Sequence, residues 1–173
     1  MKHIDWILPF TQVGSRNPMM IKIFILGKNY KYDDIDFSFD TGNGKTCVSK
    51  KVLCDLGYEN DVYDAIQTIT SRSTMADGSE YNNSEIVVSN IQIGNLYFDE
   101  FTFEIAADSD KDFSNLLGLD VIENFNPQMD FDIYEIRGKL RPICELNHFI
   151  EHEKNVKLES LEDDEFSELS NFT

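Results

Sequence analysis

The chain has 173 residues, 41% hydrophobic and 27% charged, which is enough for one buried core and favours a single domain. Its 15 basic residues are outnumbered by 32 acidic ones, and the net charge of −17 disfavours binding to nucleic acid or to an anionic membrane surface. No run of about 18 apolar residues predicts a membrane span, and the first residues lack the pattern of a secretory signal. We therefore expect a cytoplasmic protein with neither nucleic-acid nor membrane partners.

The cysteines give no sign of a disulfide framework. There are three, Cys47, Cys54 and Cys144, and none forms a Cys-x-x-Cys pair. An odd number without that spacing argues against structural disulfides and against a zinc site, so we expect buried free thiols. The sole tryptophan, Trp6, is expected in the core or at the edge of a dimer.

The first predicted elements place an acid in a turn. Apolar side chains alternate over residues 20–26 and again over 35–39, a pattern typical of strands, with turn residues at 27–29 between them. The second strand continues directly into Asp40-Thr41-Gly42-Asn43-Gly44, so an acidic side chain lies at the mouth of a tight, glycine-rich turn. Asp-Thr-Gly alone consists of three common residues and has little meaning without this setting.

The rest of the chain predicts many short strands and few helices. A helix is expected over residues 49–56, with Ser49 as its N-cap and Gly57 at its end, and a second over 120–125, capped by Asp120. Asp77-Gly78 is a strong hairpin signal. The remaining strands are predicted at residues 66–71, 74–76, 85–89, 91–93, 98–105, 128–133 and 135–140. This pattern indicates one all-β, barrel-like domain over residues 1–145.

Residues 146–173 have a different composition. The segment from residue 151 onward contains eight acidic residues and two lysines and lacks a strong period. We expect residues 146–150 to be helical and the remainder to be a disordered acidic tail.

Three short motifs occur in a distinctive order. They are Phe37 to Gly42 with Thr46 four positions further on, Met75 to Ser79, and Leu116 to Ile122. In this order and spacing the chain resembles the retroviral-type, or retropepsin-like, aspartic peptidases, over roughly residues 18–135. The resemblance implies a closed β-barrel monomer with one or two short helices and a flap hairpin, which forms a two-fold homodimer.

The resemblance also implies an activity. Asp40, Thr41 and Gly42 would supply half of an active site, and a second copy of the chain would supply the other half. Two carboxyls held close together share one proton, so one can activate water while the other polarises a peptide carbonyl. The expected enzyme is an aspartic endopeptidase that acts on polypeptides without a cofactor or metal.

The same resemblance implies which residues contact the substrate. They are Asn43 after the catalytic triplet, the hairpin residues Ala76, Asp77, Gly78 and Ser79, and the pair Leu117 and Gly118. Asn43 departs from the family, which usually has alanine or serine at this position. The alternative is therefore a retropepsin-fold dimerisation or peptide-binding module with little or no proteolytic activity.

Four other interpretations are weaker. Residues 42–46 lack the first glycine of a phosphate-binding loop, because Phe39 stands at its position. Residues 148–152 fit the His-x-x-Glu-His pattern of inverted zinc peptidases, but a third ligand is needed and a solvated helix is favoured. Residues 77–80 lack the ligand spacing of a calcium loop. Asp120 is not part of a second Asp-Thr/Ser-Gly, so we expect it to cap a helix and not to serve as a second catalytic acid.

Overall fold

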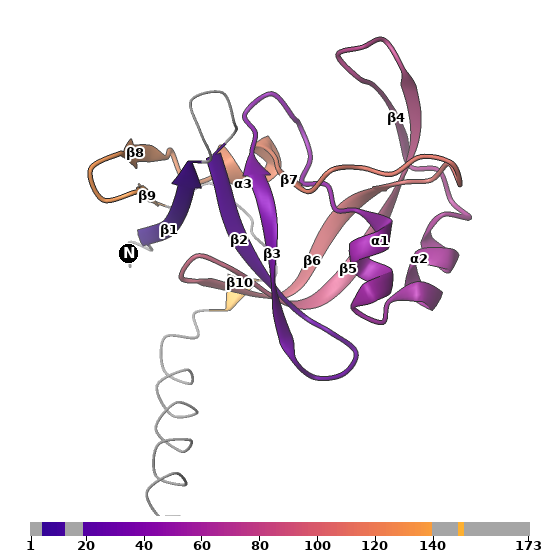
Figure 1. The fold of residues 1–173 in the computed structure, drawn as a ribbon, viewed down its shortest axis with the longest axis horizontal. Coiled ribbons are helices and arrows are strands. Elements are labelled where there is room, and N and C mark those ends of the chain that lie inside the picture. The colour runs from indigo at the N-terminus through magenta and orange to yellow at the C-terminus, as the bar shows by residue number, and fades with distance from the viewer. Residues whose placement is uncertain (1–4, 13–18, 140–148, 151–173) are drawn as a thin grey trace, which may run out of the picture.

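The structure is a computed structural model that describes residues 5–12, 19–139 and 149–150 (Figure 1). Strands make up most of it and three short helices lie between them. The helices are α1 (Lys50–Asp55), α2 (Glu59–Ala65) and α3 (Leu119–Ile122). The strands are β1 (Asp5–Gln12), β2 (Met19–Leu26), β3 (Tyr32–Phe39), β4 (Ser71–Thr74), β5 (Glu80–Ile93), β6 (Leu96–Ala106), β7 (Leu116–Leu117), β8 (Gln128–Asp130), β9 (Glu135–Lys139) and β10 (Phe149–Ile150).

All ten described strands belong to one sheet. Its main path runs β10-β6-β5-β2-β1-β9-β8, with β3 paired to β2, β4 paired to β5, and β7 paired to β3. The path is open, since no pairing among the described strands joins β8 to β10. The prediction of an all-β domain is confirmed for the described residues, whereas these pairings do not show a closed barrel.

The alternating segments form strands as predicted. Ile21, Ile23 and Ile25 of β2 are buried, while the intervening Lys22 and Phe24 are exposed. The register of β2 against β3 places Ile21 opposite Phe37, and both side chains are buried. One face of this strand pair therefore supports the core and the other meets solvent.

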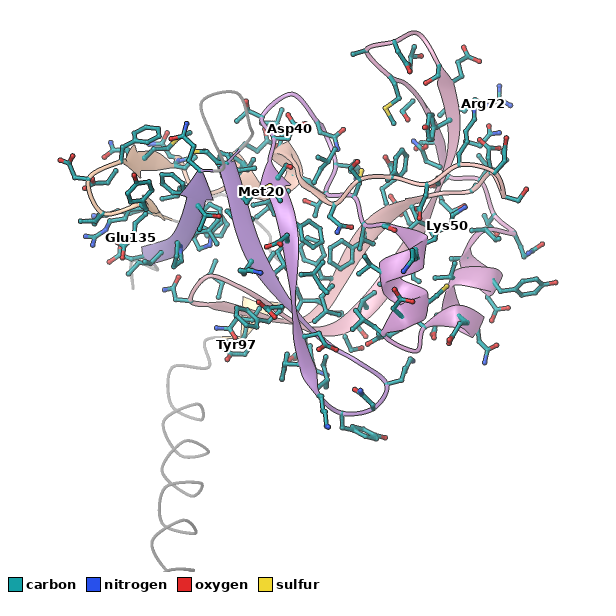
Figure 2. The ribbon with its side chains drawn as sticks, viewed as in Figure 1. Met20, Asp40, Lys50, Arg72, Tyr97 and Glu135 are labelled. Atoms are coloured by element: carbon teal, nitrogen blue, oxygen red, sulfur yellow. The ribbon has the colours of Figure 1, made fainter. Side chains whose placement is uncertain are left out.

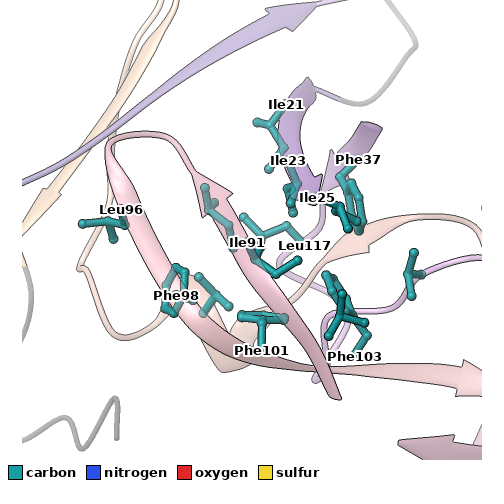
Figure 3. Packing of buried hydrophobic residues seen from close by; sticks show 14 of the residues in the cluster. Ile21, Ile23, Ile25, Phe37, Ile91, Leu96, Phe98, Phe101, Phe103 and Leu117 are labelled. Atoms are coloured by element: carbon teal, nitrogen blue, oxygen red, sulfur yellow. The ribbon is translucent and has the colours of Figure 1, made fainter. Parts of the chain in front are cut away.

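The core lies between β2, β3, β5, β6 and β7. Figure 3 shows Ile23, Ile25, Phe37, Phe103 and Leu117 gathered there, and each of these side chains is fully buried. Phe37 and Phe103 stack with ring centroids 6.0 Å apart. Burial of each such side chain contributes about 1.5–3 kcal/mol to folding, so β3, the strand that directly precedes Asp40, is firmly held.

The predicted caps of α1 and the predicted hairpin are also confirmed. Ser49 caps α1, its side chain accepting a hydrogen bond from the amide of Val52, and Gly57 follows the helix with a φ of 90°. β4 and β5 form a hairpin whose tip contains Gly78 with a φ of 84°. The two strands predicted at residues 85–89 and 91–93 are parts of one longer strand, because β5 runs without a break over fourteen residues.

Two longer elements, β1 and α2, were not predicted. β1 has the strictly alternating burial of a strand, and Trp6, Leu8 and Phe10 form its buried face. No element was predicted at the position of α2, although the spacing of the buried residues Tyr58 and Val62 is helical. The strand predicted at residues 66–71 is wrong for all but its last residue, Ser71, which begins β4.

Three further predictions concern the ends of the chain. Trp6 is fully buried, and its indole N–H donates to the carbonyl of Ile93, as expected for a core residue. Residues 149–150 form β10, which pairs with β6, and not the predicted helix. Cys144, the His-x-x-Glu-His segment apart from 149–150, and the acidic tail lie outside the described residues.

Candidate active site

Asp40 lies directly after the buried end of β3. Its backbone amide donates to the carbonyl of Leu117, 3.0 Å away, because β3 and β7 run parallel at this point. One carboxylate oxygen, Oδ1, accepts a hydrogen bond from the amide of Gly42 at 2.8 Å. The side chain is partly exposed at the end of the sheet (Figure 2). The carboxyl is thus held by its own turn and still accessible.

The loop of residues 40–46 is fixed from beneath by β7 and α3. The amide of Leu119 donates to the carbonyl of Asn43 at 2.8 Å, and the amide of Asp120 donates to the carbonyl of Gly44 at 3.2 Å. Gly118 lies so close beneath the loop that a Cβ there would be 2.4 Å from the carbonyl oxygen of Lys45. Only glycine permits this approach of two backbones.

A side-chain clamp closes the far end of the loop. Thr46 is fully buried, and its hydroxyl donates to Asp120 Oδ1 at 2.7 Å while its amide donates to Asp120 Oδ2 at 3.0 Å. The same hydroxyl accepts from the amide of Gly118 at 3.1 Å. The prediction that Asp120 is a helix cap is wrong: Gly118 occupies the N-cap position of α3, and Asp120 lies in its first turn. Both oxygens of Asp120 hold Thr46.

Asn43, the departure from the family pattern, turns toward its own loop. Its side-chain Nδ2 donates to the carbonyl of Lys45 at 2.6 Å and to the sulfur of Cys47 at 3.2 Å. These hydrogen bonds tie the side chain of Asn43 to residues of its own loop. The loop therefore accommodates a polar residue directly after Asp-Thr-Gly.

The predicted flap residues form the tip of the β4–β5 hairpin. Ala76, Asp77 and Gly78 are exposed, and Ser79 is partly exposed. The amide and hydroxyl of Ser79 both donate to Asp77 Oδ1, which lowers the pKa of Asp77. In the part of the chain that the structure describes, no hydrogen bond joins this tip to the 40–46 loop. Figure 1 shows the hairpin projecting away from the rest of the sheet.

Leu117 and Gly118 lie beneath the candidate site and not on its surface. Leu117 is fully buried in the core, and Gly118 packs under the carbonyls of the loop. In this structure they support Asp40 from below. Their predicted contact with substrate is not visible in a single chain.

The described cysteines differ in burial. Cys47 is buried as predicted, whereas Cys54 is only partly buried. Burial raises the pKa of the Cys47 thiol to about 12, and the nearby acids Glu104, Asp120 and Asp40 act in the same direction, while the bond from Asn43 opposes them. Cys47 is therefore a protonated packing residue at neutral pH.

Glu104 was not predicted as part of the site. It lies on β6, partly buried behind the loop, and burial raises the pKa of its carboxyl. A hydrogen bond from Ser71 and the charge of Lys45 oppose this shift. The sequence signal was an acid in a strand whose neighbours Phe103 and Ile105 are apolar.

The described residues contain no group of three or more His, Cys, Asp or Glu side chains that could hold a metal ion. None of the helices in the described part of the chain has the length and apolar character of a membrane span. A scan of protein-family models, a comparison with curated proteins and a comparison with solved structures each find no match for this chain. The resemblance to aspartic peptidases therefore rests on the sequence motifs alone.

Proposed function

We propose that this chain is an aspartic endopeptidase that hydrolyses peptide bonds with a water molecule activated between two Asp40 carboxyls, one from each subunit of a homodimer. The observation that carries the proposal is the setting of Asp40. Its accessible carboxyl stands at the end of a buried strand, on a loop supported by β7 and clamped by Asp120 and Thr46. Rigid support of this kind is what positions a catalytic group accurately.

The chemistry needs a second carboxyl close to the first. Asp40-Thr41-Gly42 occurs once in the sequence, so a two-fold axis would bring the partner's Asp40 into place. The two carboxyls would share one proton; the ionised one would take a proton from water and the protonated one would polarise the scissile carbonyl. The β4–β5 hairpin would close over the bound peptide and exclude bulk water.

An exposed apolar turn supports pairing with a second copy. β8 and the turn that joins it to β9 expose four large apolar side chains to between 42% and 54%, namely Met129 of β8 and Phe131, Ile133 and Tyr134 of the turn. The rings of Phe131 and Tyr134 lie 5.6 and 5.7 Å from that of Phe10. Phe10 is opposite Ile21 in the sheet, which in turn is opposite Phe37, three residues before Asp40.

This register places the apolar turn at the Asp40 end of the sheet. β8 is also the last strand of the main path, with no described strand on its outer side. Exposed apolar patches and free strand edges are features that partners cover. A second copy bound at this end would cover the turn and bring the two Asp40 loops toward each other.

The test compares two variants with the same change of charge. Asp40→Asn removes the proposed catalytic carboxyl, and Asp33→Asn removes an exposed carboxyl from the same strand, β3. With a peptide library at mildly acidic pH, we expect wild type and Asp33→Asn to cleave the same sites and Asp40→Asn to lose at least about 1,000-fold in kcat. Cleavage that survives Asp40→Asn would disprove the proposal.

The alternative function has its own outcome in this experiment. A dimer that binds peptides but cleaves none of them, in the wild type or in either variant, is a peptide-binding or dimerisation module. A statine-type inhibitor adds an independent measurement, because a ligand that binds only the folded state raises Tm. We expect a rise in Tm for the wild type and a smaller one for Asp40→Asn.

A further inference from the structure

Glu104 connects the hairpin to the loop that carries Asp40. Its backbone amide donates to the carbonyl of Thr46 at 2.9 Å, and its carbonyl accepts from the amide of Val48 at 3.1 Å. Its side chain reaches in the other direction, where Oε2 accepts from the hydroxyl of Ser71 at 3.1 Å. Ser71 is the first residue of β4, so one residue of β6 contacts both the end of the loop and the root of the hairpin.

The contacts continue on both sides of Glu104. The hydroxyl of Ser71 also accepts from the side-chain amide of Asn83, a buried residue of β5 at the other leg of the hairpin. On the loop side, the Cys47 thiol has Glu104 Oε1 at 3.9 Å and the carbonyl of Lys45 at 3.6 Å as acceptors. The hydrogen bond from Ser71 is therefore the stronger of the two interactions that the Glu104 carboxylate makes, and the contact with the Cys47 thiol is the weaker one.

We propose that Glu104 is a positioning residue that couples the root of the β4–β5 hairpin to the Asp40 loop. Without the carboxylate, the Ser71 hydroxyl keeps only its contact with Asn83, and β4 is joined to β6 only through β5, in which Asn83 pairs with Ser71 on one side and with Ala106 on the other. The hairpin root and the Asp40 loop then lose the side-chain connection that Glu104 provides. The consequence for catalysis rests on the proposed peptidase function, whereas the coupling itself does not.

Protonation of Glu104 changes how strongly the hairpin root and the Asp40 loop are held together. The charged and titratable groups that face its carboxyl are Lys45 and Cys47 from the loop, Glu85 from β5 and Asp120 from α3. The bond from Ser71 favours the ionised carboxylate, but burial is the larger effect and raises the pKa of Glu104. The closed arrangement therefore binds the proton more tightly than an opened one in which Glu104 meets water, so we expect both segments to be held more tightly when Glu104 is protonated. This change takes place as pH rises from 4.5 through the raised pKa.

Amide hydrogen exchange on the full chain tests the coupling without any need for activity. The variants are Glu104→Gln, which keeps the size of the side chain but cannot ionise, and Glu104→Ala, which removes the bond to Ser71. Glu100→Gln is the matched control, because Glu100 lies on the same strand as Glu104, β6, and is exposed. Protection factors are measured for residues 40–48 and 71–83 from about pH 4 to about pH 8.

The coupling predicts a joint response. In the wild type, the protection of residues 71–83 and 40–48 should fall together as pH rises through the raised pKa of Glu104, and in Glu104→Gln it should not depend on pH. Glu104→Ala should lower protection in both segments by at least about threefold, and Glu100→Gln in neither. Loss of protection in only one segment, or the same loss in Glu100→Gln, would overturn the proposal. If Glu104→Ala does not fold, the pH response of Glu104→Gln decides.

Catalytic measurements separate this proposal from the peptidase proposal. In an active enzyme, Glu104→Gln should change the pH profile of kcat and leave the cleavage sites unchanged, while Glu100→Gln keeps the wild-type profile. An active Glu104→Gln enzyme with wild-type pH profile and wild-type exchange disproves the coupling and leaves the peptidase proposal intact. A wild type without any activity disproves the peptidase proposal, and the exchange data still decide the coupling.

Discussion

Asp120 holds Thr46 across a separation of 74 residues, with one carboxylate oxygen on the hydroxyl and the other on the backbone amide. The pair joins the two halves of the candidate site, because Thr46 ends the Asp40 loop and Asp120 opens α3. Thr46 is fully buried, so water cannot replace these bonds. The rigidity of the loop depends on an acid that does not take part in the proposed chemistry.

Removal of this acid should destabilise the fold. Asp120→Ala leaves the buried amide and hydroxyl of Thr46 without their acceptors, and we expect the free energy of unfolding to fall by about 3 kcal/mol. Denaturant titration followed by circular dichroism measures the change. Asp110→Ala, at an exposed position in the preceding loop, should be close to neutral. Equal stability of the two variants would mean that the clamp contributes nothing.

Gly118 should not tolerate a side chain. Gly118→Ala would bring Cβ within 2.4 Å of the Lys45 carbonyl oxygen and 2.5 Å of its carbon, which forces the loop to move. We expect a loss of at least about 3 kcal/mol in the free energy of unfolding. The control is Gly44→Ala in the same loop, where a Cβ has no neighbour within 4 Å and stability should change by less than about 1 kcal/mol.

Cys47 should resist alkylation in the folded protein. With a pKa of about 12, only about one thiol in 10,000 is ionised at pH 8, and the thiolate is the form that reacts. Treatment with iodoacetamide followed by mass spectrometry of peptides should find Cys47 unmodified under native conditions and fully modified in guanidinium chloride. Native modification of Cys47 as fast as that of a free thiol would contradict its burial.

Glu104 should make stability depend on pH in a defined direction. Its pKa is raised in the folded chain above the ordinary value of 4.5, so the folded state binds more protons than the unfolded state in this range. The free energy of unfolding of the wild type, measured relative to Glu104→Gln, should therefore fall as pH rises from 4.5 through the raised pKa. Denaturant titrations of both proteins across this range provide the comparison. A difference that grows with pH would contradict the direction of the shift.

The apolar turn between β8 and β9 should control dimerisation. Ile133→Glu places a charge on a half-exposed apolar residue of this turn, and we expect the dimer dissociation constant to rise at least about tenfold. Sedimentation equilibrium measures it. Val87→Glu, at a similarly exposed apolar residue of β5, serves as the control and should leave the constant unchanged. A strictly monomeric wild type would remove the basis for a shared site.

Local patterns were enough to predict several elements. Alternation of apolar residues indicated β2 and β3, Ser49 and Gly57 marked the ends of α1, and Asp77-Gly78 marked the hairpin tip. Each of these signals comes from residues that are close together in the sequence, within a single turn, helix or strand. α2 was missed because it is short and mostly polar, and a single buried residue, Val62, leaves no clear helical period in the sequence.

The sequence by itself determined where Asp40 lies relative to a strand, because a strand, an acid and a glycine turn are consecutive in the chain. Only the tertiary structure decided what holds that turn: Gly118 beneath it, Asp120 on Thr46 and Glu104 beside Ser71. The contact between Asp120 and Thr46 spans 74 residues, and the contact between Glu104 and Ser71 spans 33. Such contacts leave no periodic trace in the sequence, because they arise when strands distant along the chain are brought together by burial of a shared core.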